Sequence, residues 1–262
     1  MNIYIGGWGH GNLGDEAVLM TTIKHYGKDA VVVTPYPDHT KALHNIETTT
    51  LDAIPTEIDK VIIGGGGLFY GDSAIHYANV IKHFYTLGVP VIIFNVGVGK
   101  INDNIRDTLA LCEKITVRNV RSAKNLNLQA EVLIWPDQDL PDGNAPEWLD
   151  KIEGPLIGVC LKNVDNDMVL PSEGTIIGLA ECTHRHALFE DDTWGNKEKG
   201  IDTSLAFTDP RDLKAAIGKL DVLYTNRKHA YLWGLGHGIK CHYVESTLSG
   251  TSTGEIPLRN GW

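Results

Sequence analysis

Short apolar runs alternate with segments of helical spacing along most of this chain. The runs are rich in Val and Ile and lack polar alternation, which is typical of strands buried on both faces of a parallel sheet. In the first half, strands are expected at 3–5, 30–34, 59–63, 89–94, 114–118 and 131–135, whereas 38–58 shows little pattern. Helices are expected between them at 15–27, 75–87, 103–113 and 122–128. This order predicts a Rossmann-like α/β lobe.

A stretch rich in Pro, Gly, Asp and Asn at 136–155 interrupts the pattern. Such a composition is typical of a linker, so we expect lobes at 1–140 and 151–262. In the second lobe, strands are expected at 156–161, 175–180, 221–225 and 239–244 and helices at 211–217 and 227–236, whereas 181–204 shows little pattern. Asp209 and Pro210 mark the start of the earlier helix. The second lobe is expected to be reduced, because a helix between its first two strands is hardly visible.

The loop after the first strand is rich in glycine and leads directly into a helix. It reads GGWGHGNLGDE from residue 6 to residue 16. Glycines let backbone N–H groups approach a ligand and a helix N-terminus attracts anions, so Gly11 and Asn12 are expected to bind substrate. Asp15 and Glu16 would repel a pyrophosphate, which disfavours a dinucleotide site despite the formal G-x-G-x-x-G match. Helix capping and a catalytic role explain these two carboxylates equally well.

Glycines and cations also follow later strands. Gly65 and Gly66 lie in a run of glycines after the third strand, and Arg118 ends the fifth. The carboxyl ends of strands line one crevice in an open doubly wound sheet, so these residues are expected to lie in a binding site. An ion pair with one of the many acids explains Arg118 equally well.

The sequence Arg227-Lys228-His229 lies between a predicted strand and a predicted helix. Cations at a helix N-terminus oppose the helix dipole, which is unfavourable unless an anion lies between them. The motif therefore predicts an anion site, and a solvated basic turn is the alternative.

The composition of the chain argues against several classes of function. The chain has 262 residues, 42% of them hydrophobic and 21% charged, as in an ordinary globular protein. Its net charge of −10 argues against nucleic-acid binding. No apolar run approaches bilayer length and no leader precedes the first strand, so a cytoplasmic protein without a transmembrane segment is expected. The four cysteines are scattered without a C-x-x-C pair, which is typical of reduced thiols.

Five motifs, in this order, resemble those of the polysaccharide pyruvyl transferase family. They are GHGNLGDEA at 9–17, VIIGGGGL at 61–68, VGVG at 96–99, TVRNVRS at 116–122 and DVLYTNRKHA at 221–230. The resemblance implies two lobes facing a cleft in a GT-B-like α/β fold. It also implies transfer of the enolpyruvyl skeleton of phosphoenolpyruvate to a sugar, which forms a pyruvate ketal.

The family's Arg-Leu-His motif corresponds to Arg227 and His229, with Lys228 in place of leucine. The arginine of its Val-Arg-Asp motif corresponds to Arg118, with Asn119 in place of aspartate. Phosphoenolpyruvate carries a carboxylate and a phosphate, which arginine and lysine side chains bind well. The cations expected to bind it are Arg118, Arg227, Lys162 and Lys228.

Ketal formation needs an acid for the vinyl carbon and a base for the attacking hydroxyl. His229 is the expected acid or base, and Asp15 or Glu16 is the expected base on the acceptor side. No cofactor or metal is expected, with phosphoenolpyruvate as donor substrate and a saccharide as acceptor. The Asp-x-Asp matches at 137–139 and 165–167 lie in turn-like stretches, which explains the acids without a cation.

Other candidate sites and functions are less favoured. The Cys182 to His186 cluster lacks a second cluster at zinc spacing, so a solvated loop is favoured. Trp194 and Trp233 are more often core residues than sugar platforms. The alternatives to pyruvyl transfer are a GT-B-type glycosyltransferase that uses a nucleotide sugar and a non-catalytic glycan-binding relative. The pattern indicates no particular oligomeric state.

Overall fold

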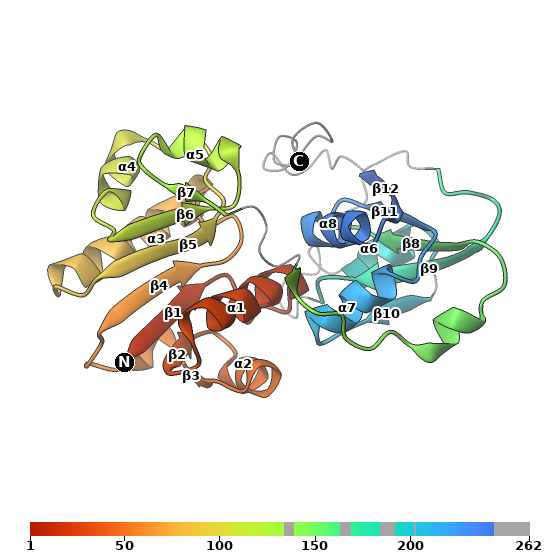
Figure 1. Cartoon of the computed structure of the whole chain (residues 1–262), viewed down its shortest axis with the longest axis horizontal. Coiled ribbons are helices and arrows are strands. Elements are labelled where there is room, and N and C mark those ends of the chain that lie inside the picture. The colour runs from red at the N-terminus through yellow and green to blue at the C-terminus, as the bar shows by residue number, and fades with distance from the viewer. Residues whose placement is uncertain (134–138, 163–168, 184–191, 202, 244–262) are drawn as a thin grey trace. The chain divides into compact units, whose positions relative to one another are not determined.

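The computed structural model of the chain describes residues 1–133, 139–162, 169–183, 192–201 and 203–243 (Figure 1). The chain divides into two compact units. Unit 1 comprises residues 1–10 and 18–137, and unit 2 comprises residues 11–17 and 138–262. The start of the first helix therefore belongs with the second half of the chain, a placement that the expected lobes at 1–140 and 151–262 do not include.

Unit 1 is built on a seven-stranded parallel sheet with the order β3-β2-β1-β4-β5-β6-β7. Its strands are β1 (Asn2–Gly6), β2 (Ala30–Val33), β3 (Glu47–Thr49), β4 (Lys60–Gly64), β5 (Val91–Val96), β6 (Lys114–Val117) and β7 (Glu131–Val132). The helices in this part of the chain are α1 (Leu13–Tyr26), α2 (Pro37–His44), α3 (Gly71–Thr86), α4 (Asp103–Leu109) and α5 (Val120–Leu126), with a 3-10 turn at Leu51–Ala53. The strand order reverses direction between β1 and β4, as in doubly wound sheets.

The apolar runs form the strands that the sequence predicts, whereas α2 and β3 form where the pattern is weak. α2 begins at Pro37, whose fixed φ and missing N–H suit the first turn of a helix. It ends at Asn45, which adopts the left-handed conformation with φ 49°. α4 ends at Leu109 and is shorter than the expected helix at 103–113.

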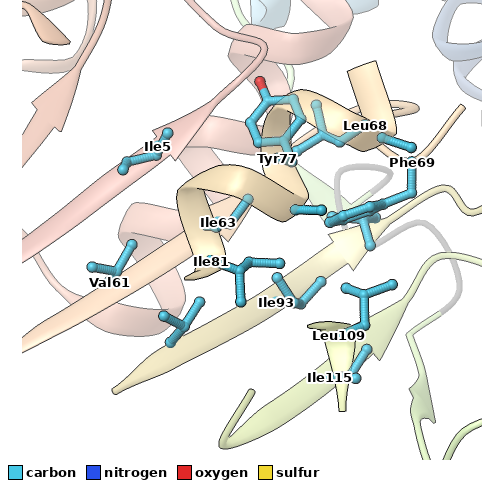
Figure 2. Close-up of a cluster of buried hydrophobic side chains, with 14 of the residues drawn as sticks. Ile5, Val61, Ile63, Leu68, Phe69, Tyr77, Ile81, Ile93, Leu109 and Ile115 are labelled. Atoms are coloured by element: carbon cyan, nitrogen blue, oxygen red, sulfur yellow. The ribbon is translucent and has the colours of Figure 1, made fainter. Parts of the chain in front are cut away.

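One apolar core of unit 1 lies between the sheet and α3, and Figure 2 shows its side chains. Ile63 of β4, Ile93 of β5 and Ile81 of α3 are fully buried in it. Burying a side chain of this size stabilises the fold by about 1.5–3 kcal/mol. This packing fixes the carboxyl end of β4, where the loop containing Gly65 and Gly66 begins.

Unit 2 is built on a five-stranded parallel sheet with the order β10-β9-β8-β11-β12. Its strands are β8 (Leu156–Cys160), β9 (Thr175–Ala180), β10 (Ser204–Ala206), β11 (Val222–Thr225) and β12 (Lys240–Tyr243). Its helices are α6 (Asp192–Glu198), α7 (Pro210–Ile217) and α8 (Lys228–Gly236), with a 3-10 turn at Glu147–Lys151. In the described residues this sheet has five strands, against seven in unit 1.

The start of α7 agrees with its sequence signal. Asp209 is the N-cap, its carboxylate accepts a hydrogen bond from the N–H of Arg211, and Pro210 is the first helical residue. By contrast, the sequence predicts neither α6 nor β10. No helix in the described ranges is long and apolar enough to cross a membrane.

Candidate active site

A group of buried charged side chains lies in unit 2, where β9 and β11 end and α8 begins. The turn from β11 into α8 is fixed by Thr225, whose hydroxyl donates to the carbonyl of Cys160 at 2.7 Å and accepts from the N–H of Arg227 at 2.9 Å. Arg227 is the N-cap of α8 and makes no side-chain cap hydrogen bond.

Arg227 forms a buried ion pair with Asp192, the first residue of α6. Its Nε lies 2.8 Å from Asp192 Oδ1 and its Nη2 lies 2.5 Å from the same oxygen. Asp192 Oδ2 also accepts from the backbone N–H groups of Glu181 and Cys182, at 2.9 and 3.0 Å. Burial acts to lower the pKa of Arg227, but the charge and hydrogen bonds of Asp192 outweigh burial and raise it. The sequence predicts an anion beside Arg227, and the protein itself supplies one in the carboxylate of Asp192.

His229 forms a second buried pair, with Glu181, the residue that follows β9. The His229 Nδ1 atom lies 3.6 Å from Glu181 Oε1, and both side chains are almost fully buried. Glu181 Oε2 accepts from the N–H of Ala230 at 2.9 Å, in the first turn of α8. Burial acts to raise the pKa of Glu181, but the hydrogen bond and charge of His229, with the charge of Arg227, outweigh it and lower the pKa. The carboxylate of Glu181 therefore occupies the positive end of α8.

The segment 11–17 packs against the same region of unit 2. The N–H of Leu13 donates to the carbonyl of Glu181 at 2.8 Å, and the N–H of Thr183 donates to the carbonyl of Gly11 at 3.1 Å. Asn12 caps α1, because its side-chain oxygen accepts from the N–H of Gly14 at 3.0 Å. A Cβ on Gly14 would lie 2.0 Å from His229 Nδ1, so only glycine lets the start of α1 approach the imidazole.

Asp15 and Glu16 follow in the first turn of α1, where acids favour the helix dipole. Glu16 is fully buried, whereas Asp15 is partly exposed. Of the two carboxylates proposed from the sequence, Asp15 is the more accessible one.

The two candidate lysines lie at the ends of neighbouring strands in unit 2. Lys162 follows β8, and its backbone exchanges two hydrogen bonds with the Asn226 side chain, at 2.6 and 2.5 Å. Lys228 is the first residue of α8, after β11. Because β8 and β11 pair directly, both partly exposed lysines lie at the same edge of the sheet as Arg227.

The remaining candidates belong to unit 1. Arg118 follows β6 and is 5% exposed. A Cβ on Gly97 would lie 2.5 Å from its Nη2 atom, so this glycine makes room for the guanidinium. Gly65 and Gly66 adopt φ of +92° and +58°, and the carbonyl of Gly66 accepts from the N–H of Gly97 at 2.9 Å. The three candidates thus lie at the carboxyl ends of β4 and β6, on either side of β5.

The comparison with known families agrees with the motifs that build these sites. A family model described as polysaccharide pyruvyl transferase matches residues 12–247. The chain belongs to the polysaccharide pyruvyl transferase family. No curated protein matches the sequence.

Solved structures that resemble this pyruvyl transferase family member share its fold at very low identity. The S. aureus MnaA–UDP co-structure is 11% identical with a TM-score of 0.59, over 94% of this chain and 79% of that chain. UDP-GlcNAc 2-epimerase from Neisseria meningitidis, bound to UDP-GlcNAc, is 9% identical with a TM-score of 0.56, over 94% of this chain and 83% of that chain. UDP-GlcNAc 2-epimerase from Methanocaldococcus jannaschii is 9% identical with a TM-score of 0.54, over 92% of this chain and 82% of that chain. The chain therefore has an α/β fold with parallel sheets, Rossmann-like and GT-B-like.

Sequence reasoning about this family member missed Glu181 and Asp192, the two carboxylates that bind the Arg-Lys-His motif. Both lie in the weakly patterned stretch 181–204, and the one available signal was an acid directly after a predicted strand. Trp233 is a core residue of α8, 1% exposed, with its ring centroid 5.9 Å from that of His229.

Some candidates fall outside the described residues. They are Asp137, Asp165, Asp167, His184, His186 and the side chain of Trp194. Among the residues that the structure describes, no group of three or more His, Cys, Asp or Glu side chains could hold a metal ion.

Proposed function

We propose that this protein transfers the pyruvyl group of phosphoenolpyruvate to a saccharide, forming a pyruvate ketal. The observation that carries the proposal is the buried pair that His229, a residue of the motif that the family shares, forms with Glu181 at the start of α8. A histidine held beside a carboxylate is suited to donate and accept a proton near neutral pH.

The donor brings several negative charges into the site. Arg227 is already balanced by Asp192, so this pair adds no net positive charge. Lys162 and Lys228 are then the residues of unit 2 that offset the charge of the phosphate and the carboxylate. We assign Arg118, Gly65 and Gly66 of unit 1 to substrate binding as well, on the basis of the family motifs.

The reaction needs two kinds of proton transfer. An acid, assigned to His229, protonates the CH₂ carbon of phosphoenolpyruvate, and a cation-like centre forms at C2. A saccharide hydroxyl attacks C2 and gives its proton to a base, assigned to Asp15. A second hydroxyl then attacks C2 and gives its proton to the departing phosphate, while the bond between C2 and the phosphate oxygen breaks. Two new C–O bonds form, and inorganic phosphate leaves.

The proposal is tested by incubating the protein with phosphoenolpyruvate and a panel of glycans. Phosphate release that depends on one glycan, with a matching mass gain in that glycan, is the expected result. His229→Gln is expected to keep donor binding and to lower turnover by about 10²-fold, the usual contribution of an acid or base. Turnover at the wild-type rate in this variant would contradict the role given to His229.

The similar solved structures support a second candidate, because two of them contain UDP or UDP-GlcNAc. A glycosyltransferase with this fold would bind a nucleoside diphosphate. Thermal shift measurements with phosphoenolpyruvate, UDP and GDP separate the two, since only the true donor class is expected to raise the melting temperature. A non-catalytic glycan-binding relative would bind glycans without turnover.

A further inference from the structure

We propose that Glu181 is a positioning residue that selects the ring tautomer of His229 and stabilises its protonated form. Glu181 has no part in the motifs that mark the family resemblance, and it acts through His229 without contacting the substrate. The proposal rests on the proposed function for its catalytic consequence, and its first test needs no substrate.

The carboxylate of Glu181 is held in place from several sides. One oxygen, Oε2, accepts from the N–H of Ala230 at 2.9 Å, which leaves Oε1 directed at His229 Nδ1 at 3.6 Å. The backbone N–H of Glu181 donates to Asp192 at 2.9 Å, and its carbonyl accepts from Leu13 at 2.8 Å. Because two hydrogen bonds fix the backbone of Glu181 and a third fixes Oε2, the carboxylate has little freedom to turn away from the imidazole.

The imidazole is confined as well. The start of α1 lies against Nδ1, where a Cβ on Gly14 would lie 2.0 Å away, and the ring of Trp233 lies at 5.9 Å. The His229 side chain is 8% exposed, so water screens its interaction with Glu181 weakly. A ring that cannot turn presents Nδ1 to Glu181 in both protonation states. Nδ1 then carries the fixed proton, and Nε2 exchanges the proton of the reaction.

Charge explains why the imidazolium needs this partner. His229 lies in the first turn of α8, where the helix dipole disfavours a positive charge, and it follows the N-cap Arg227 by two positions. Asp192 of α6, Cys160 of β8, Cys182 and Arg227 interact electrostatically with Glu181 or with one another. Lys228 precedes His229 in α8, and Asp15 and Glu16 follow Gly14 in α1. Asp192 is engaged by Arg227, so Glu181 is the carboxylate that faces Nδ1 directly.

The direct test follows the titration of the His229 ring by NMR in the free protein, with His229→Gln to assign the signal. In Glu181→Gln the amide oxygen can still accept from Ala230, but the negative charge is gone. We expect the midpoint of the His229 titration to fall by about 1 pH unit or more, the usual effect of losing an opposite charge at this distance. Glu113→Gln, which removes a charge from a partly exposed pair with Lys60, is the control and should leave the midpoint unchanged.

An unchanged His229 midpoint in folded Glu181→Gln would overturn the proposal. Glu181→Asp keeps the charge and shortens the side chain, so it should give a smaller shift; it also serves as the second variant if Glu181→Gln does not fold.

In the activity assay, the kcat of Glu181→Gln should fall by at least about 10-fold with a small change in KM, and its kcat–pH profile should move with the NMR midpoint. A shifted titration with an unchanged kcat would also overturn the positioning role. If the His229 midpoint shifts in Glu181→Gln but the wild-type protein does not turn over phosphoenolpyruvate, the proposed function is refuted and the interaction of Glu181 with His229 stands.

Discussion

At the residue scale, the most consequential contact is the ion pair between Arg227 and Asp192, because both side chains are buried. Removing one partner of a buried pair leaves an uncompensated charge, which costs about 3–5 kcal/mol. We therefore expect Arg227→Ala to lower the free energy of unfolding by about that amount, measured by urea denaturation. The control is Arg211→Ala, which breaks a partly exposed pair with Asp209 and should cost about 0–1 kcal/mol. Equal effects of the two variants would show that the buried pair contributes little.

Glu181 predicts a pH dependence of stability. Its pKa in the folded protein lies below the ordinary value of 4.5, so the unfolded chain binds the proton more readily. The stabilisation that the ionised Glu181 carboxylate gives to the folded protein is present above pH 4.5 and is lost as the pH falls through the lowered pKa. We expect the difference in unfolding free energy between wild type and Glu181→Gln to shrink as the pH is lowered from about 6 to about 3. A difference that stays constant over this range would mean that the pKa of Glu181 is not lowered by folding.

The residue scale also shows where sequence reasoning reaches its limit. The dipole of α8 predicts an anion beside Arg227 and His229, and the structure places the carboxylates of Asp192 and Glu181 there. It does not identify Glu181 or Asp192, because those contacts join residues separated by 48 and 35 positions, which local patterns do not encode.

At the scale of elements, Gly14 is the residue that lets α1 start against His229. A methyl group there would lie 2.0 Å from the imidazole, so the ring or the helix must move. We expect Gly14→Ala to cost about 1–3 kcal/mol of stability and to lower turnover at least 10-fold. The control is Gly236→Ala at the exposed end of α8, where a Cβ meets no atom within 4 Å. Thermal unfolding and phosphate release measure both variants, and wild-type behaviour of Gly14→Ala would show that the ring position is not critical.

The elements that the sequence predicts are those with a strong local signal. The short apolar runs of β4, β5 and β8 are typical of buried strands, and Asp209 with Pro210 fixes the start of α7. The sequence does not predict α6, because the buried side chains that the structure describes in it are polar. Asp192 and Asn196 point into the unit, where Asn196 donates to the carbonyl of Leu179, so the helix lacks the apolar period that prediction needs.

At the scale of the whole molecule, the segment 11–17 joins the two halves of the sequence in one unit. Asn12 pairs with Cys182 as an isolated antiparallel bridge, and Gly14 lies against His229. A linear sequence divides at the linker near 136–155, so the lobes expected at 1–140 and 151–262 do not place this segment in unit 2. The pairing depends on backbone hydrogen bonds between distant residues, which carry no signal in composition or periodicity.

The whole site predicts independence from metal ions. Lysines, arginines and the N-termini of helices can offset the charge of a phosphate without a cation. We expect activity to persist after exhaustive dialysis against a chelator, measured as phosphate release. Complete loss that magnesium or manganese restores would contradict this expectation and favour a nucleotide-sugar donor.

The central claim is pyruvyl transfer, and the most direct measurement follows the carbon of the donor into the product. Phosphoenolpyruvate labelled with ¹³C at C2 is incubated with the protein and an acceptor glycan, and the purified glycan is examined by NMR. The account predicts that the label appears as a quaternary ketal carbon bonded to two glycan oxygens, and that His229→Gln loses most of this signal. Labelled phosphoenolpyruvate recovered unchanged, while the same protein transfers a sugar from a nucleotide donor to the glycan, would contradict the account.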